Sequence, residues 1–203
     1  MYDELDILRE VGSIAAGHGS IVLSTMLSRN ITLNVPSVDI IACDEVPKNI
    51  SLKNIDVAIF SQLFEGFEGA VAFVLDQKSV FRMVDLYCKV EDGESPSRVT
   101  ETALSLIREI GNVIIGAYLD VLSSVVRKAI VPPYATIISG DIDNIMYLIF
   151  SPYERDDYAC FIETIFEEPK DKIKGGFYLI LSSDSADELR RRLKEALDKK
   201  RNV

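Results

Sequence analysis

The sequence contains few of the residues that build metal or redox sites. Its 203 residues include one histidine, His18, and three isolated cysteines, Cys43, Cys88 and Cys160. No two cysteines have the spacing of a zinc-binding pair, which argues against a zinc cluster. The three thiols are therefore expected to be free, buried, and in a reducing compartment.

Long apolar runs and a basic N-terminus are also absent. No stretch approaches the ~18 consecutive apolar residues that span a bilayer. The chain opens with Asp3, Glu4 and Asp6, unlike the basic start of a signal peptide. We therefore expect a cytoplasmic protein. Its 48% hydrophobic and 27% charged residues are an ordinary globular balance, and the chain is long enough to bury a sizeable core.

Positive charge is scarce, with 22 Lys and Arg against 32 Asp and Glu and a net charge of −10. Because a phosphate backbone selects for clustered basic residues, this balance argues against a nucleic-acid partner. The one dense basic run, RRRLKEALDKKR, is interrupted by Glu195 and Asp198, and leucines recur at every fourth position. This pattern predicts an amphipathic helix over about 186–199 with a solvated charged face.

The remaining pattern divides the chain into two similar halves separated by the polar segment EDGESPS. The first half predicts a helix over about 3–28, strands around Pro36, a hairpin formed by VAIFSQLF and GAVAFVL, and a helix begun by Asp76. The second half predicts a long helix over about 96–127. Four strands then follow, in KAIVPPYATIIS, NIMYLIFSP, YACFIETIF and GGFYLILSS, before the final helix.

We therefore predict an α+β fold in which an antiparallel sheet packs against helices. The chain is predicted to be one domain, 1–203, made of two helix–strands–helix repeats, about 1–92 and 96–203, related by a pseudo-two-fold axis. Gly69 in the first half aligns with Gly175 or Gly176 in the second, so the second repeat carries several additional residues.

The clearest sign of duplication is a pair of helical segments, LREVGSIAAG at 8–17 and IREIGNVIIG at 107–116. They share an arginine, a glutamate and two glycines, but Ser13 stands where the later copy has Asn112. Gly12 and Gly111 are predicted to point toward the apolar side of each helix, where a missing side chain lets another element pack closely.

The polar residues of each segment fall on one helix face when projected at about 100° per residue. They form a second-half stripe and a first-half stripe. The second-half stripe is Ser105, Glu109, Asn112 and Gly116, and the first-half stripe is Asp6, Glu10, Ser13 and Gly17. Both stripes are predicted to face solvent or a partner, away from the core. A glycine there is costly, because alanine would favour the helix by ~1 kcal/mol.

A carboxylate and an amide one turn apart suit the positioning of a water molecule. The amide of Asn112 can both donate and accept hydrogen bonds, so it can hold water in line for attack on phosphorus. Glu109 can bind a lysine of a protein substrate. A serine reaches less far and cannot hold water at two points.

The motif Asp/Ser, three residues, Glu, two residues, Asn, and Pro 23 positions later resembles the CheC/CheX/FliY family of chemotaxis phosphatases. With two copies of the unit over nearly the whole chain, the likeness is to CheC. The resemblance implies hydrolysis of the aspartyl phosphate of CheY, and binding of the deamidase CheD. It also implies that Glu109 pairs with a CheY lysine, that Asn112 orients the attacking water, and that Ser105 fills the first motif position. The magnesium belongs to CheY, so no cofactor or metal of this chain is implied.

Two departures from that motif are informative. In the first copy Asp6, Glu10 and Pro36 fit, but Ser13 replaces the asparagine, so this site is predicted to be impaired or inactive. In the second copy the proline position falls at Ala135, with two prolines just before it. A two-residue deletion between helix and strand would explain that shift.

Three interpretations of function are open at this point. The first is a phosphatase acting through Glu109 and Asn112. The second is a non-catalytic adaptor that binds CheD or phospho-CheY, and the third is an unrelated α+β interaction domain. The segment GSIAAGHGS is not a phosphate-binding loop, because it lies inside a helical pattern and has His18 in place of the lysine. His18 is expected to cap or pack rather than to act as a base.

Overall fold

The computed structural model describes residues 4–42, 45–50, 52, 55–88, 101–150, 158–170 and 172–201. Its helices are α1 (Glu4–Leu27), α2 (Val46–Asn49), α3 (Gln77–Cys88), α4 (Glu101–Val126), α5 (Ile142–Phe150) and α6 (Ser183–Arg201). Its strands are β1 (Thr32–Ala42), β2 (Val57–Leu63), β3 (Gly69–Leu75), β4 (Thr136–Ser139), β5 (Tyr158–Glu168) and β6 (Ile173–Ser182). The predicted repeat boundary near EDGESPS, the predicted helix start at Pro96 and Cys43 lie outside the described residues.

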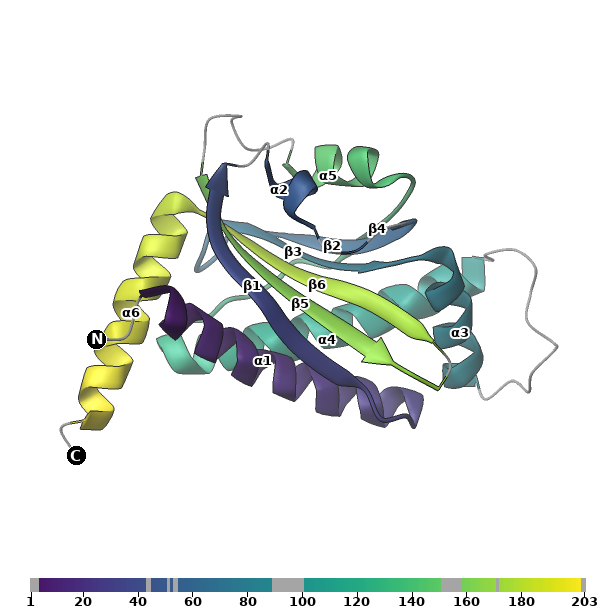
Figure 1. Cartoon of the computed structure of the whole chain (residues 1–203), viewed down its shortest axis with the longest axis horizontal. Coiled ribbons are helices and arrows are strands. Elements are labelled where there is room, and N and C mark those ends of the chain that lie inside the picture. Colours follow the sequence, from purple (N-terminus) through teal and green to yellow (C-terminus); the bar gives the residue numbers. More distant parts are fainter. Residues whose placement is uncertain are drawn as a thin grey trace.

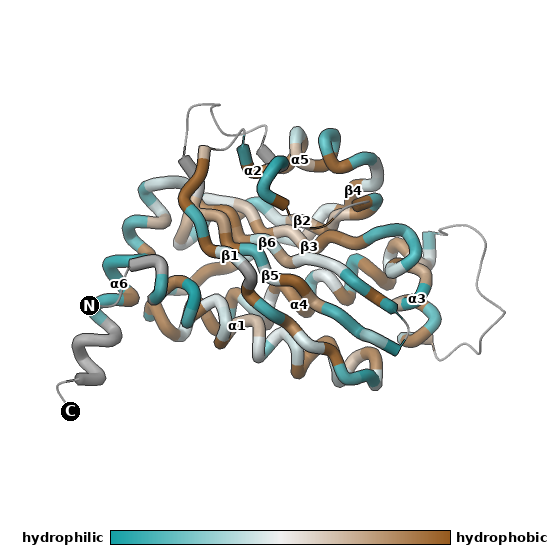
Figure 2. Tube along the Cα trace, in the orientation of Figure 1, coloured by the Kyte–Doolittle hydropathy of each residue, from teal (hydrophilic) through white to brown (hydrophobic). Residues whose placement is uncertain are grey.

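One antiparallel sheet of six strands organises the molecule, in the order β1-β5-β6-β3-β2-β4. Helices α1 and α4 lie side by side across one face of this sheet, with α3 and α6 at opposite ends, and α2 and α5 cover the other face (Figure 1). Apolar residues concentrate in the central strands (Figure 2), and every residue of β3 is buried. The predicted α+β class with an antiparallel sheet and packed helices is confirmed.

The second half repeats the order of elements of the first: helix, strand, short helix, two strands, helix. Exchanging corresponding strands, β1 with β4, β2 with β5 and β3 with β6, reverses the sheet order onto itself. The first strand of each half pairs with the hairpin of the other half, β1 with β5 and β4 with β2. Each half therefore completes the sheet of the other, and the two form one packed unit.

The ends of α1 and α4 are alike at the level of single hydrogen bonds. Ser28 and Arg127, which follow the two helices, both have φ of +52°, in the left-handed region that terminates a helix. One turn earlier Ser24 and Ser123 each accept a hydrogen bond, at 3.0 Å, from the backbone N–H seven residues later. These matched ends support the interpretation of the halves as repeats of one unit.

The predicted strand in NIMYLIFSP is wrong, because residues 142–150 form α5. Asp141 caps this helix by accepting the N–H of Asn144 at 2.9 Å. The residues that α5 buries against the sheet recur at helical spacing, namely Ile145, Met146 and Ile149. A short apolar run is compatible with either a strand or a buried helix, and the Asp141 cap is the local feature that favours the helix here.

The strand predicted over KAIVPPYATIIS is shorter than expected, since β4 is limited to Thr136–Ser139. Pro132 and Pro133 have no N–H to donate to a sheet, which limits pairing before residue 134. The hairpin predicted from VAIFSQLF and GAVAFVL is present as β2 and β3, and the final helix is present as α6.

The predicted deletion between the second long helix and its strand is also wrong. In the first half Val38 pairs with Ile162, and in the second half Ile137 pairs with Ile59. Val38 and Ile137 lie at the same distance from their motif helices, so helix and strand keep one register in both halves. Ala135 therefore occupies the place of Pro36.

The pairing also decides which glycine matches Gly69. Gly69 lies opposite Leu63 at the end of its hairpin, and Gly175 lies opposite Phe166 at the end of the other. A Cβ on Gly69 would lie 2.2 Å from the carbonyl oxygen of Ile180, and a Cβ on Gly175 would lie 2.7 Å from that of Val74. The structure thus matches Gly69 with Gly175, and both positions exclude a side chain.

Among the described helices, α4 is long and apolar enough to cross a membrane by length and composition alone. Its apolar residues have another explanation in this structure, because they pack against the sheet. The most deeply buried of them include Ile107, Ile110, Ile114, Tyr118 and Leu122, each at most 2% exposed.

Candidate functional site

Both polar stripes predicted on the long helices lie on the side that faces away from the sheet. On α4, Ser105 and Glu109 are exposed, and Asn112 and Gly116 are partly exposed. On α1 the whole first-half stripe is exposed, namely Asp6, Glu10, Ser13 and Gly17. The helix projection therefore assigned these faces correctly.

The two stripes run outward from a contact between the helices. His18 Nδ1–H donates to the carbonyl oxygen of Ala117 at 3.3 Å, and these two residues hold the same place in the two repeats, 99 positions apart. Because α1 and α4 run in opposite directions (Figure 1), Gly17 and Gly116 lie near this contact and the glutamates lie farther from it. His18 thus links the two helices through a hydrogen bond of its exposed side chain.

The outer glycines leave open space on the surface. A Cβ at Gly17 or at Gly116 would meet no atom within 4 Å, so nothing in the described structure requires glycine there. Alanine at either place would favour the helix by ~1 kcal/mol. A bare backbone on an exposed helix face lets a partner approach more closely than any side chain would allow.

The inner glycines are packed against the sheet, as predicted. A Cβ on Gly12 would lie 3.4 Å from Ile162 Cγ2, and a Cβ on Gly111 would lie 2.6 Å from Ile59 Cγ2. Ile162 and Ile59 are the residues that pair with Val38 and Ile137, so each motif helix contacts the equivalent position in a strand of the other half. The second-half contact is the tighter one.

The polar residues Asn112 and Ser13 make different hydrogen bonds. Asn112 Oδ1 accepts the backbone N–H of Ala135 at 3.1 Å, which links α4 to the segment just before β4. Ser13 Oγ donates to the carbonyl oxygen of Arg9 at 2.8 Å, four residues earlier in its own helix. In the second half, therefore, the Asn112 amide is bonded to a residue outside its own helix. In the first half, the Ser13 hydroxyl donates its proton to a carbonyl of its own helix.

Glu10 and Glu109 are exposed, and neither carboxylate has an ion-pair partner among the described residues. Asp6, in contrast, lies 3.5 Å from Arg9 in an ion pair whose two side chains are about half exposed. Such an exposed pair adds little to stability. The two glutamates are therefore free to receive a cation from another molecule.

The described residues contain no group of three or more His, Cys, Asp and Glu side chains arranged to hold a metal ion. Of the cysteines, Cys160 is buried and Cys88 is exposed, and both are free. Burial raises the pKa of the Cys160 thiol to about 11, so it stays protonated near neutral pH. Cys160 packs in the core between the sheet and the helices α1 and α4, away from both stripes.

One contact of this candidate site could not be read directly from the residue pattern, namely the hydrogen bond from the backbone N–H of Ala135 to Asn112. The sequence did show that Ala135 stands where the motif has proline, and any residue other than proline at this position adds a backbone N–H donor. That the donor points at Asn112 is a fact of the tertiary structure alone.

Comparison with protein-family models finds no match for this chain. Two curated proteins of Bacillus subtilis (strain 168) are similar in sequence. The CheY-P phosphatase CheC is 26% identical over 136 residues, 64% of this chain and 63% of that protein. The flagellar motor switch phosphatase FliY is 28% identical over 127 residues, 63% of this chain and 33% of that protein. The matched part thus spans less than two thirds of either relative.

A solved structure of Thermotoga maritima FliY has the same fold. It superimposes with a TM-score of 0.78 over 97% of this chain and 98% of that one, at 24% sequence identity. The resemblance to CheC- and FliY-type chemotaxis proteins that the motif indicated is therefore confirmed by two sequence relatives, and the fold by this structure.

Proposed function

We propose that this relative of the CheC- and FliY-type chemotaxis proteins is a hydrolase that removes the phosphoryl group from an aspartate of a CheY-type response regulator. The observation that carries the proposal is the partly exposed Asn112 amide, one turn from Glu109 on the same face of α4, whose carboxylate has no ion-pair partner among the described residues. The name of the curated relative, a CheY-P phosphatase, supports the choice of substrate.

Glu109 anchors the regulator in this proposal. Its carboxylate is exposed and has no ion-pair partner among the described residues, so it can pair with a lysine beside the phosphorylated aspartate. Ser105 lies one turn earlier on the same stripe and Gly116 one turn after Asn112, and we assign both to substrate contact. The open space over Gly116 lets the regulator surface come close to the helix.

Asn112 positions the nucleophile. It holds a water molecule in line with the bond between phosphorus and the aspartate oxygen. The water oxygen forms a new bond to phosphorus while that P–O bond breaks, and its electron pair returns to the aspartate. Inorganic phosphate leaves with the oxygen of the water, whose proton is released to solvent. The magnesium ion that neutralises charge at such a phosphate is contributed by the regulator.

The first half has a different part in this proposal. Glu10 is exposed and can bind a second regulator or extend the docking surface, but Ser13 offers no amide to hold water. The degenerate stripe of Asp6, Ser13 and Gly17 is therefore proposed to bind without hydrolysis. This half also favours a second candidate function for the chain, an adaptor that binds phospho-CheY or the deamidase CheD and does not hydrolyse.

The test is phosphate release from a phosphorylated CheY-type regulator, comparing wild type with Asn112→Ala and with Glu109→Lys. Loss of a group that stabilises the transition state lowers the rate by ~10² or more. We expect Asn112→Ala to lose release while still binding the regulator, and Glu109→Lys to lose both. A wild type that binds without accelerating release would establish the adaptor, and a wild type that does not bind would refute both functions.

A further inference from the structure

The contact between α1 and α4 determines which residues of α1 lie beside the Asn112 site. His18 on α1 donates to the carbonyl oxygen of Ala117 on α4, and the two helices run in opposite directions (Figure 1). Residues after His18 therefore lie level with residues before Ala117. At a rise of about 1.5 Å per residue, Ile21 lies about 4.5 Å and Asn112 about 7.5 Å from this contact along the helices, on the same side of it.

Two exposed apolar side chains lie at this level, one on each helix. Ile21 is 66% exposed. Val113 directly follows Asn112, is 41% exposed, and lies about 6 Å from the contact on the same side as Ile21. We call Ile21 and Val113 the apolar pair. Because removing apolar surface from water is favourable, a molecule that covers the apolar pair gains binding free energy from it.

The corresponding pair beside the first-half stripe is different. The two repeats are offset by 99 positions, so Ile14 corresponds to Val113, and Asp120 corresponds to Ile21. Ile14 and Asp120 are both exposed, and they lie level with each other on the opposite side of the contact between the helices. The stripe with the asparagine thus has an isoleucine of the neighbouring helix beside it, whereas the stripe with the serine has a carboxylate there.

A protein bound at Asn112 also covers Ile21. Gly116 lies about 1.5 Å from the contact between the helices, and the open space over it admits a close approach. A surface that rests on both Gly116 and Asn112 therefore spans the level of Ile21. Packed helices have axes about 8–10 Å apart, and a specific protein interface covers about 800 Å² on each partner. Such an interface extends over both helices.

We infer that Ile21 is a specificity-determining residue for the regulator, because α1 uses it to complete the docking surface of the Asn112 site on α4. This inference rests on the proposed function. The regulator that fits carries an apolar side chain against the apolar pair, next to the lysine that pairs with Glu109. Asp120 disfavours the same contact at the first-half stripe, since a carboxylate covered by an apolar group loses water without gaining a partner.

The variant that tests this inference is Ile21→Asp, which copies Asp120, with Ile14→Asp as the matched control. Both replace an exposed isoleucine of α1, but Ile14 lies on the other side of the contact between the helices. We expect Ile21→Asp to raise KM for phosphate release from the regulator about tenfold with kcat unchanged, because the lost contact stabilises substrate and transition state equally. Ile14→Asp and the conservative Ile21→Leu should stay within about twofold of wild type.

An unchanged KM in Ile21→Asp, or equal rises in Ile21→Asp and Ile14→Asp, would overturn the inference. A wild type that dimerises, with Ile21→Asp monomeric and unchanged in KM, would overturn it too, since the apolar pair would then be covered by a second copy of this chain. Thermal unfolding of each variant checks that the fold is kept.

A binding measurement separates this inference from the proposed function. The probe is the regulator with beryllofluoride in place of its phosphoryl group, titrated in a Glu10→Lys background so that the first-half anchor does not contribute. Ile21→Asp should raise the dissociation constant about tenfold and Ile14→Asp by less than about twofold. If wild type binds but releases no phosphate, the proposed hydrolase fails and these constants still decide the role of Ile21. No binding by wild type would overturn both.

Discussion

The α1 half and the α4 half of this molecule make the same contacts with the sheet but present different chemistry to the outside. Gly12 meets Ile162 as Gly111 meets Ile59, and both helices end in the same serine-capped turn. On the outer face, in contrast, one half carries a hydroxyl bonded to its own helix and the other an amide bonded to the strand segment.

The difference follows from what each face must do. A residue between helix and sheet is held by close packing, where a change of one methyl group is felt. A residue on the outer face has no such constraint and can change without loss of the fold. The two halves can therefore differ in the chemistry of their outer faces while they pack against the sheet in the same way.

The largest effect is expected when the amide is moved from one half to the other. In an Asn112→Ala background, Ser13→Asn should raise phosphate release to within about tenfold of wild type, against the loss of ~10² or more caused by Asn112→Ala alone.

The control for this exchange is Ser13→Gln, which adds an amide one methylene too far from the helix. Release should stay near the level of Asn112→Ala in that variant. Equal recovery by asparagine and glutamine would contradict a role for amide position, and no recovery with asparagine would show that Ser13 is not what disables the first stripe.

The inner glycines offer a comparison in stability. In Gly111→Ala the new Cβ would lie 2.6 Å and 2.9 Å from Ile59 side-chain atoms, so the helix or the strand must shift, at a cost of about 1–3 kcal/mol. In Gly12→Ala the nearest atom is 3.4 Å away, an ordinary contact, and the gain in helix propensity is up to ~1 kcal/mol. Urea unfolding should therefore show Gly111→Ala destabilised and Gly12→Ala neutral or stabilised. Equal losses in both would mean that the halves are packed equally tightly.

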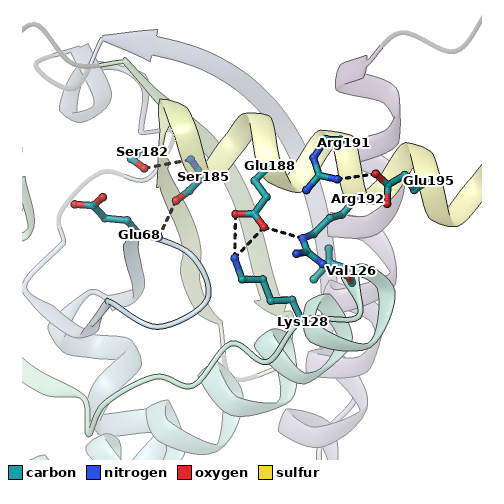
Figure 3. A network of polar contacts seen from close by, with 9 residues as sticks. All are labelled: Glu68, Val126, Lys128, Ser182, Ser185, Glu188, Arg191, Arg192 and Glu195. Atoms are coloured by element: carbon teal, nitrogen blue, oxygen red, sulfur yellow. Dashed lines mark hydrogen bonds and ion pairs between the residues drawn. The ribbon is translucent and has the colours of Figure 1, made fainter.

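The smallest effect is expected at the polar network that joins α4 to α6 (Figure 3). Lys128 Nζ lies 2.9 Å from both carboxylate oxygens of Glu188, and Arg192 Nε donates to the same group at 2.8 Å. Arg29 holds the corresponding place after α1, where its guanidinium donates to the Ser28 carbonyl at 3.3 Å. The contacts of Lys128 and Arg192 with Glu188 thus lie within the second half.

Hydrogen bonds from Lys128 and Arg192 lower the pKa of Glu188 from its usual 4.5. A lowered folded-state pKa means that the stabilisation is present above the unfolded pKa and is lost as pH falls through the folded value. Glu188→Gln should therefore lower Tm slightly at pH 7, and the difference from wild type should shrink as pH falls below about 4. A difference that is constant with pH would show that the charge of Glu188 does not contribute. Glu195→Gln, on an exposed i,i+4 pair with Arg191 in the same helix, is the matched control.

Local pattern was sufficient for the parts of this fold that depend on periodicity. The apolar spacing placed the core side of α4, and the opposite side proved to be exposed at Glu109 and partly exposed at Asn112. The apolar spacing gave the wrong element at α5, because a run of nine residues is too short for its periodicity to distinguish a helix from a strand. The pattern also misplaced the position equivalent to Pro36. Two prolines before Ala135 suggested a deletion, which the pairing of β4 with β2 excludes.

Two related helices, the polar face of each, and the amide that one of them carries where the other has a hydroxyl were all predictable from the residues alone. These features follow from side-chain order along a helix, which is a local property. Two features became visible in the folded chain alone: each half completes the sheet of the other, and a backbone N–H before β4 reaches Asn112. The reason is that pairing between distant strands sets which backbone groups meet, and no spacing within one segment encodes it.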